Sequence, residues 1–340
     1  MGSEDPDLAG DPAAEWRVRV KIYFAPLEGI TGYVFRRVYE ECFGGVDLYF
    51  SPFISTTQKR KLRPKEMRDI LPENNPGIKL VPQILGNHAE DFLHVVQVMA
   101  ELGYPSVNLN LGCPSRTVVS KGKGSGFLEH TVALNRFLES IYAKSPVKIS
   151  IKTRLGKDDP EEFYALLRIF NQYPVEELII HPRVQADYYT NTPNWDLYEV
   201  AERESVNPVC YNGDLFTLED VRRFRKRFGQ TERIMLGRGL LSHPQLAGAI
   251  RRELAGEPQE ELTAQQLQHF IKRLEEEYSL VMSGETPVLF KMKEIWGFLI
   301  QSICEGESYK KKIHKCQKLA GYDRIVEELF LSEPKIQQIR

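Results

Sequence analysis

The stretch VKISIKTRLGKDDPEEFYALLRIFNQYPVEELIIHP, Val147 to Pro182, has two β-rich apolar segments on either side of a helix-like segment. The flanking segments, VKISIKT and ELIIHP, are the near-continuous apolar runs that parallel strands carry when helices cover them. Between them, Asp159 and Pro160 signal a helix start, because proline is tolerated in the first turn. This stretch therefore predicts a strand, a helix and a second strand parallel to the first.

Six further segments of the chain continue this alternation. They are IYFAP from Ile22, LYFSPF from Leu48, IKLVPQIL from Ile78, SVNLNLG from Ser106, NPVCYNG from Asn207 and RIMLG from Arg233. Asn87 can cap the helix after the third of them, and Thr217 with Asp220 forms a capping-box-like start to another. Eight strand–helix units predict an α/β fold, a (β/α)8 TIM barrel. An open doubly wound sheet is the alternative, but no GxGxxG follows its first strand.

The two ends of the chain differ from this pattern. Met1 to Glu15 is rich in Asp, Gly, Pro and Ala, so we expect residues 1–20 to be a disordered leader and residues 21–256 to be the barrel. After Glu257 the strand signals stop. The segments TAQQLQHFIKRLEEEYSLV, VLFKMKEIWGFLIQSI and YDRIVEELFL predict helices, so we expect residues 257–340 to form a second, helical domain.

The composition excludes several classes of protein. The chain has 340 residues, 42% hydrophobic and 27% charged, as is ordinary for globular proteins. No apolar run approaches the roughly 20 residues that span a bilayer, and the N-terminus lacks a secretory signal, so no membrane partner is expected. Five cysteines at irregular spacings, without CxxC or paired Cys/His patterns, favour a reduced cytoplasmic setting and no metal.

A net charge of −2 gives no overall attraction to nucleic acid. Any such binding must use local basic runs, of which there are three: residues 58–68, 222–228 and 309–318. Each run alone is also typical of a solvated surface.

Polar residues follow nearly every predicted strand, at the barrel end that holds active sites. They are Glu28, Ser51, Gln83, Asn108, Asn110, Cys113, Lys152, Arg154, His181, Arg183, Asn212, Asp214 and Arg238. The last two strands end in the glycine turns Asn212-Gly213-Asp214 and Gly237-Arg238-Gly239. Such turns let backbone N–H groups approach a phosphate, and many barrels bind phosphate here. Tight turns without a ligand are the alternative.

Three polar residues interrupt segments that otherwise indicate buried strands. Lys152 is costly to bury without a partner, which suggests an anionic or electron-rich ligand; a side chain reaching solvent is the alternative. Gln83 suits the edge of a heterocycle, or a structural hydrogen bond to a neighbouring strand. His181 lies at a strand end beside Pro182 and Arg183, which favours a ligand contact over a core role.

Cys113 lies where a buried strand passes into a basic, glycine-rich loop in NLNLGCPSRTVVSKGKGSGFL, Asn108 to Leu128. The glycines let the loop close, and the nearby cations are expected to favour a thiolate and attract phosphates. A single cysteine in this place can serve as nucleophile or general acid.

Together these motifs resemble those of the tRNA-dihydrouridine synthase family. FAPLEGIT from Phe24 is similar to the family's opening strand, the 108–128 segment resembles its cysteine loop, and VKISIKTRLG, IIHPRV, YNGD and MLGRGLL follow in family order. The resemblance spans Ile22 to Leu254, and the helical tail fits the second domain. It implies an enzyme of the cytoplasm that binds FMN, takes hydride from NADPH and reduces the C5–C6 double bond of a uridine in the tRNA D-loop. We expect a monomer.

The resemblance also assigns roles to individual residues. Cys113 is the general acid that protonates C5. The substrate base or its backbone is faced by Asn110, Arg154 and Arg183. The cofactor is bound by Ala25, Pro26, Leu27, Gln83, Lys152, His181, Asn212, Gly213, Asp214, Gly237 and Arg238. Leu27 stands where many members have methionine, and Gly126-Phe127 replaces a pair of small residues.

Two other functions fit part of the sequence. An FMN oxidoreductase like dihydroorotate dehydrogenase shares the fold and the pyrimidine chemistry, but its small substrate leaves the tail and the basic runs unexplained. A catalytically idle RNA-binding protein leaves Cys113 and the flavin residues unexplained.

Overall fold

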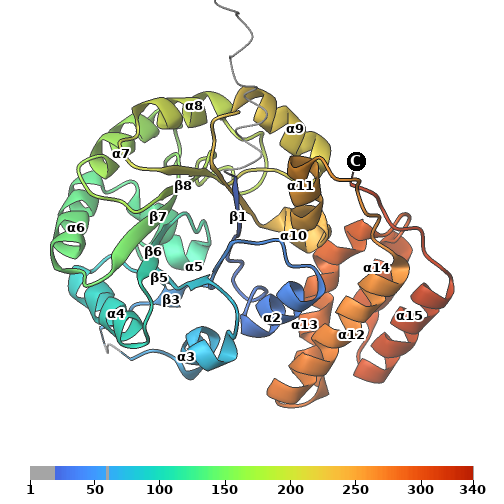
Figure 1. Cartoon of the computed structure of the whole chain (residues 1–340). Helices are drawn as coiled ribbons and strands as arrows, with labels where there is room; N and C mark the ends of the chain where they lie inside the picture. Colours follow the sequence, from blue (N-terminus) through green and yellow to red (C-terminus); the bar gives the residue numbers. More distant parts are fainter. Residues whose placement is uncertain (1–19, 59–60, 340) are drawn as a thin grey trace, which may run out of the picture.

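A computed structural model of the chain describes residues 20–58 and 61–339 (Figure 1). The predicted leader, residues 1–20, lies outside the described residues except for Val20. Ten parallel strands form one curled sheet in the order β3-β5-β6-β7-β8-β9-β10-β1-β2-β4. The strands are β1 Lys21–Phe24, β2 Leu48–Phe50, β3 Ile54–Ser55, β4 Leu80–Val81, β5 Gln83–Leu85, β6 Ser106–Leu111, β7 Lys148–Arg154, β8 Leu178–His181, β9 Val209–Tyr211 and β10 Arg233–Leu236.

The sheet closes on itself at Pro82. β4 pairs with β2 and β5 pairs with β6, while only Pro82 separates β4 from β5 along the chain. Proline cannot donate a ladder hydrogen bond, but its carbonyl accepts one from Asn108 N at 2.9 Å. The eight predicted strand segments therefore form a barrel, with β3 as a short addition beside β5, and the predicted fold is confirmed.

Helices surround the barrel (Figure 1). They are α2 Tyr33–Cys42, α3 Pro64–Ile70, α4 Ala89–Glu101, α5 Arg116–Val119, α6 Thr131–Lys144, α7 Glu162–Phe170, α8 Trp195–Glu204, α9 Leu218–Arg227, α10 Arg238–Ser242 and α11 Leu246–Ala255, with 3-10 turns at Pro72–Asn74 and Gly124–Phe127. The capping box of Thr217 and Asp220 is confirmed. The predicted cap at Asn87 is wrong: α4 begins after His88, and Asn87 Nδ2 instead donates to the carbonyls of Lys121 and Gly122.

The tail packs against one side of the barrel (Figure 1). Its helices are α12 Ala264–Val281, α13 Glu285–Leu299, α14 Glu307–Lys315 and α15 Leu319–Leu331, with a 3-10 turn at Ile300–Ser302. Phe270 of α12 inserts among aromatic rings of α2, with ring centroids 5.9 Å from Phe35 and 5.0 Å from the adjoining Phe43. The tail and the barrel therefore share one apolar core. A domain boundary between residues 256 and 257 stays a prediction.

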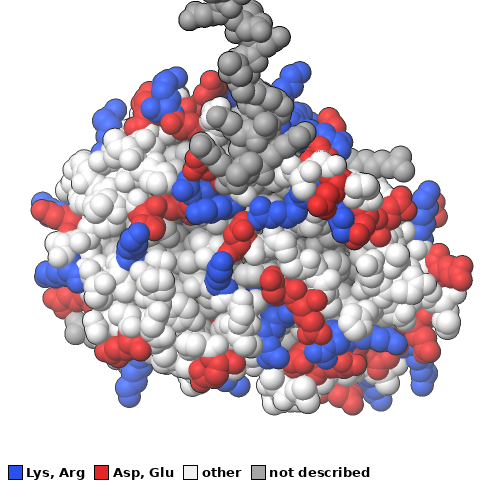
Figure 2. All heavy atoms as spheres, in the orientation of Figure 1, with Lys and Arg blue, Asp and Glu red and all other residues white. Residues whose placement is uncertain are grey.

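Charge is mixed on the face of the molecule that Figure 2 shows, where blue and red side chains are interspersed. The basic run 222–228 is paired with acids: Arg222 lies 2.7 Å from Glu253, and Arg227 lies 2.5 Å from Asp196. Such pairing favours the solvated-surface interpretation of this run. Among the helices of the described residues, none has the length and apolarity needed to cross a membrane.

Candidate active site

A pocket lies at the carboxyl ends of the barrel strands. Its space, open solvent included, is about 470 Å³. The lining residues are Ala25, Pro26, Leu27, Lys152, His181, Tyr189, Asn212, Gly213, Asp214, Phe216, Gly237, Arg238 and Gly239. Of the predicted cofactor-binding residues, all but Gln83 are in this lining.

The glycine turns are required by space. A Cβ atom at Gly213 would collide with the Tyr211 ring, and one at Gly239 would collide with the carbonyl of Leu215. At Gly237 a Cβ would press on the Ala25 side chain at 3.2 Å. The backbone here is therefore packed closely against the floor of the pocket, and side chains leave the space above it open.

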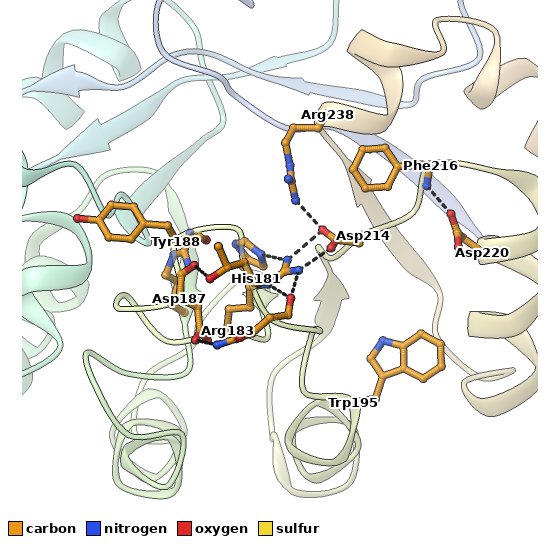
Figure 3. A network of polar contacts seen from close by, with 12 residues as sticks. His181, Arg183, Asp187, Tyr188, Trp195, Asp214, Phe216, Asp220 and Arg238 are labelled. Atoms are coloured by element: carbon orange, nitrogen blue, oxygen red, sulfur yellow. Dashed lines mark hydrogen bonds and ion pairs between the residues drawn. The ribbon is translucent and has the colours of Figure 1, made fainter. Parts of the chain in front are cut away.

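Asp214 is shared by two arginines (Figure 3). Arg183 donates from Nη1 to Oδ1 at 2.9 Å and from Nη2 to Oδ2 at 2.5 Å, and Arg238 Nη2 donates to Oδ1 at 2.6 Å. Arg183 also donates to the carbonyls of Thr190 and Asn191. Bidentate Arg–carboxylate pairs fix geometry well, so this network sets the position of Arg238 at one end of the pocket.

His181 is held neutral. Its Nε2 lies 3.1 Å from Arg183 Nη1. Because a guanidinium can only donate, Nε2 accepts and the ring proton is on Nδ1. Burial, and then the charges of Arg154 and Lys152, hold the pKa of His181 well below its usual value. The site therefore contains a neutral imidazole with one N–H donor.

Lys152 is the exception in this pocket, because among the described residues no group hydrogen-bonds or pairs with its ammonium. It is half-buried in β7, and burial, followed by repulsion from Arg154, lowers the pKa of Lys152 to about 8. The charged residues of the lining are the cations Lys152 and Arg238 and the carboxylate Asp214, which also binds the buried Arg183. The pocket consequently has the charge and an unused donor that suit an anionic ligand.

The Cys113 turn is fixed by neighbouring strands. Asn110 Oδ1 accepts from Gly112 N at 3.0 Å and from Cys113 N at 2.9 Å, and Arg154 Nε donates to Gly112 O at 2.9 Å. Gly124 has a φ of +56°, and a Cβ there would lie 2.7 Å from Cys113 O. The thiol therefore has a rigid base at the end of β6.

Nearby cations favour a thiolate at Cys113, as expected, but burial has the larger and opposite effect on the thiol. Burial raises the pKa of Cys113, and this outweighs the Ser115 N–H and the charge of Arg154, which both lower it. A neutral thiol carries the proton that a general acid needs.

The loop after Cys113 lies closed on the barrel. Lys123 Nζ donates to Thr56 O at 2.7 Å, and Asn87 Nδ2 donates to Lys121 O at 3.0 Å and to Gly122 O at 3.1 Å. These contacts attach the loop to the segments that follow β3 and β5, so Cys113 is held near the mouth.

Gln83 belongs to a chain of amides inside the barrel. Asn110 Nδ2 donates to Gln83 Oε1 at 2.7 Å, Gln83 Nε2 to Asn108 Oδ1 at 2.8 Å, and Asn108 Nδ2 to Ser150 Oγ at 2.8 Å. This chain joins three strands and connects Gln83 to the residue that holds the Cys113 turn. A contact between Gln83 and a cofactor stays a prediction.

Arg154 and Arg183 are buried and bonded within the protein, at 1% and 2% exposure. Besides Gly112, Arg154 donates to the carbonyls of Val184 and Tyr188 at 2.9 and 2.8 Å. Both arginines therefore join loops around the mouth. Their predicted contact with substrate is not tested by this geometry.

Tyr189 and Phe216 line the pocket, although the sequence analysis does not predict either of them as a site residue. The Arg238 guanidinium lies 4.4 Å from the Tyr189 ring centroid and 5.4 Å from that of Phe216, and Tyr189 stacks near His181 at 5.9 Å. Neither residue is in a strand, so no periodicity marked them. The only available signal was an aromatic pair, Tyr188 and Tyr189, soon after a strand end.

The family model described as "Dihydrouridine synthase (Dus)" matches residues 23–333. The chain belongs to the dihydrouridine synthase family. The match includes the tail helices, so it extends beyond the predicted resemblance of residues 22–254. Leu27, where the resemblance predicts methionine in many members, lies in the lining of the pocket.

Named members of the dihydrouridine synthase family are similar over most of the chain. A tRNA-dihydrouridine(16) synthase of Cupriavidus necator is 30% identical over 265 residues, covering 75% of this chain and 81% of the relative. Probable tRNA-dihydrouridine synthase 2 of Bacillus subtilis is 30% identical, covering 67% and 72%. Among solved structures, a mutant of morphinone reductase in complex with tetrahydroNAD has a TM-score of 0.50 at 10% identity, covering 69% of this chain and 87% of that chain. The last likeness concerns the fold alone.

Proposed function

We propose that this protein is a flavin-dependent tRNA-dihydrouridine synthase that reduces the C5–C6 double bond of a D-loop uridine, with FMN as cofactor and NADPH as reductant. One observation carries the proposal: the pocket at the barrel mouth is lined by Arg238 and by Lys152, which has no partner among the described residues, and the Cys113 turn is held rigidly nearby. Family membership provides the reaction class.

The pocket fits FMN by its chemistry. The Lys152 ammonium and the His181 Nδ1–H are donors for the electron-rich edge of a flavin ring, which would rest on Ala25, Pro26 and Leu27. The turns at Asn212–Asp214 and Gly237, with Arg238, would hold the phosphate end, because glycines leave space there and Arg238 is charged. When bound, FMN supplies the hydride that reaches C6 of the uracil.

Cys113 then completes the reduction. Hydride addition at C6 leaves negative charge delocalised over C5 and the C4 carbonyl, and the product forms when C5 gains a proton. The neutral thiol donates its proton to C5 and takes a new one from solvent afterwards. Asn110 fixes the turn that aims the thiol, and Gln83 fixes Asn110 in turn.

The substrate is a base extruded from tRNA into the mouth. We propose that Asn110, Arg154 and Arg183 lie beside the base or its backbone, the arginines mainly through the loops that they hold. We propose residues 257–340 as the tRNA-binding domain of a cytoplasmic monomer. The cations of α14 support this only in part, since Lys310 pairs with Glu307 and Lys312 with Glu328.

The test is dihydrouridine formation in an unmodified tRNA transcript, incubated with the purified protein, FMN and NADPH and analysed by mass spectrometry of nucleosides. We expect one D-loop uridine to gain two hydrogens. A protein that reduces flavin but leaves every uridine intact would contradict the proposal. Interconversion of orotate and dihydroorotate in its place would favour the small-substrate oxidoreductase.

A further inference from the structure

The loop between β8 and α8, residues 182–194, holds a bulky residue in a strained backbone conformation. Tyr188 has a φ of +51°, in the left-handed region that favours glycine, and the residue is 41% exposed. For a large side chain this conformation is a genuine outlier, and such strain persists only where the surroundings enforce it.

The surroundings explain the backbone but not the ring. Tyr188 O accepts from Arg154 Nη2 at 2.8 Å, and Arg154 also donates to Gly112 O beside Cys113. The strained conformation therefore brings a carbonyl to the arginine that supports the Cys113 turn. Glycine or asparagine would present the same carbonyl with less strain. The aromatic side chain needs a separate reason.

The Tyr188 ring has no stacking or hydrogen-bonding partner among residues 20–58 and 61–339. No described residue stacks on Tyr188 or hydrogen-bonds its hydroxyl, whereas the neighbouring Tyr189 contacts His181, Arg154 and Arg238. Figure 3 shows the Tyr188 ring pointing away from Asp214 and Arg238. The Tyr188 ring is thus exposed beside the pocket, because its neighbour Tyr189 is a lining residue and its own carbonyl is bonded to Arg154.

We propose that the Tyr188 ring stacks on a nucleotide adjacent to the target uridine and so positions the RNA at the mouth. This inference rests on the proposed function. An extruded base leaves its neighbours without a stacking partner, and a protein ring replaces that partner. Because Tyr188 does not touch the reacting atoms, it is a positioning residue. Its fixed backbone limits the entropy lost when the base binds.

The test compares Tyr188→Asn with the wild type. Asparagine tolerates the left-handed conformation, so we expect an unchanged or higher Tm. The KM for tRNA should rise about 5- to 100-fold, roughly 1–3 kcal/mol at about 1.4 kcal/mol per factor of ten, while NADPH-driven flavin reduction stays unchanged. Tyr188→Phe should restore the wild-type KM, because stacking needs no hydroxyl. Val206→Asn, an exposed site just before β9, is the control and should change neither value.

An unchanged KM in Tyr188→Asn would overturn the inference, as would a Tyr188→Phe variant as impaired as Tyr188→Asn. A wild-type protein that forms no dihydrouridine would instead contradict the proposed function, so the two failures are distinct.

Discussion

The two ends of this barrel both contain ionisable groups with little exposure, and they differ at one lysine of the carboxyl end. At the amino ends of the strands, Tyr23 donates to Glu177 Oε1 at 2.9 Å, and Arg233 Nε lies 2.7 Å from the same atom. The three side chains of this triad are therefore partners of one another. At the carboxyl ends, Lys152 has no partner among the described residues. Buried polar groups with partners inside the protein need no ligand, and a group without such a partner indicates where a ligand can supply one.

The largest expected effect concerns Cys113. Cys113→Ala should retain FMN and its reduction by NADPH but lose dihydrouridine formation by about 10²–10⁴-fold, the usual contribution of general acid catalysis. Rates are measured by nucleoside analysis at matched flavin content. Cys42→Ala, at a cysteine of α2, is the control and should keep the wild-type rate. A near-normal rate in Cys113→Ala would refute the role of the thiol.

Arg233→Ala tests the triad at the amino ends of the strands. Its loss leaves the Glu177 carboxylate buried without its cation, so the free energy of unfolding should fall by about 3 kcal/mol at pH 8. Flavin content per folded molecule should not change. The measurement is denaturant unfolding with flavin analysis of the native fraction. A loss of flavin without loss of stability would reverse the assignment of the two ends.

The pH dependence of the free energy of unfolding gives a second test of the triad, through Glu177. Burial raises the pKa of Glu177 from 4.5 to about 7. Between these values the folded protein binds more protons than the unfolded chain, so stability should fall as the pH rises from about 4.5 to 7. Glu177→Gln removes the titrating group and should flatten this slope. An equal slope in the variant, measured by urea unfolding across the range, would exclude Glu177 as its source.

Lys152→Met tests the carboxyl end of the barrel. Unlike Arg233→Ala, this substitution is not expected to lower the free energy of unfolding. Removing a half-buried, unpaired cation should leave the stability of the apoprotein unchanged or raise it. The variant should bind FMN at least about tenfold more weakly, on the scale of one lost charge-assisted hydrogen bond. Fluorescence titration with FMN measures the affinity. Wild-type affinity would show that Lys152 does not contact the cofactor.

The smallest expected effect concerns α14. Neutralising Lys310, Lys311 and Lys312 should weaken tRNA binding and reduce its salt dependence, without changing NADPH oxidation. The effect should be modest, because two of these lysines are already paired with Glu307 and Glu328. Filter binding at several salt concentrations checks it. Unchanged affinity would assign this run to the solvated surface.

Features encoded in nearby residues were predictable from the sequence, and those that depend on distant contacts were not. The strand segments and the cap at Thr217 follow from local pattern. The sequence predicts Asn87 as a helix cap, because its position fits a cap and its true partners, two carbonyls, lie more than 30 residues away. The helix α14 was missed, since its run of lysines hides the apolar face.

The same distinction holds in the site. The residues at strand ends could be found because the barrel brings all such ends to one mouth. The direction of the shift in the pKa of Cys113 could not be predicted, because the cations near Cys113 are visible in the sequence but its burial is not. Tyr189 lies in a loop that is held by contacts with Asp187 and Arg154. These contacts could not be read from the sequence, so Tyr189 could not be predicted as a lining residue.

We propose that FMN occupies the pocket at the carboxyl ends of the barrel strands and supplies the partner that Lys152 lacks. The most direct measurement is the chromatographic identity of the flavin released when the purified protein is denatured after reconstitution and desalting. We predict FMN, about one per chain. Release of FAD, or of no flavin, would contradict the account.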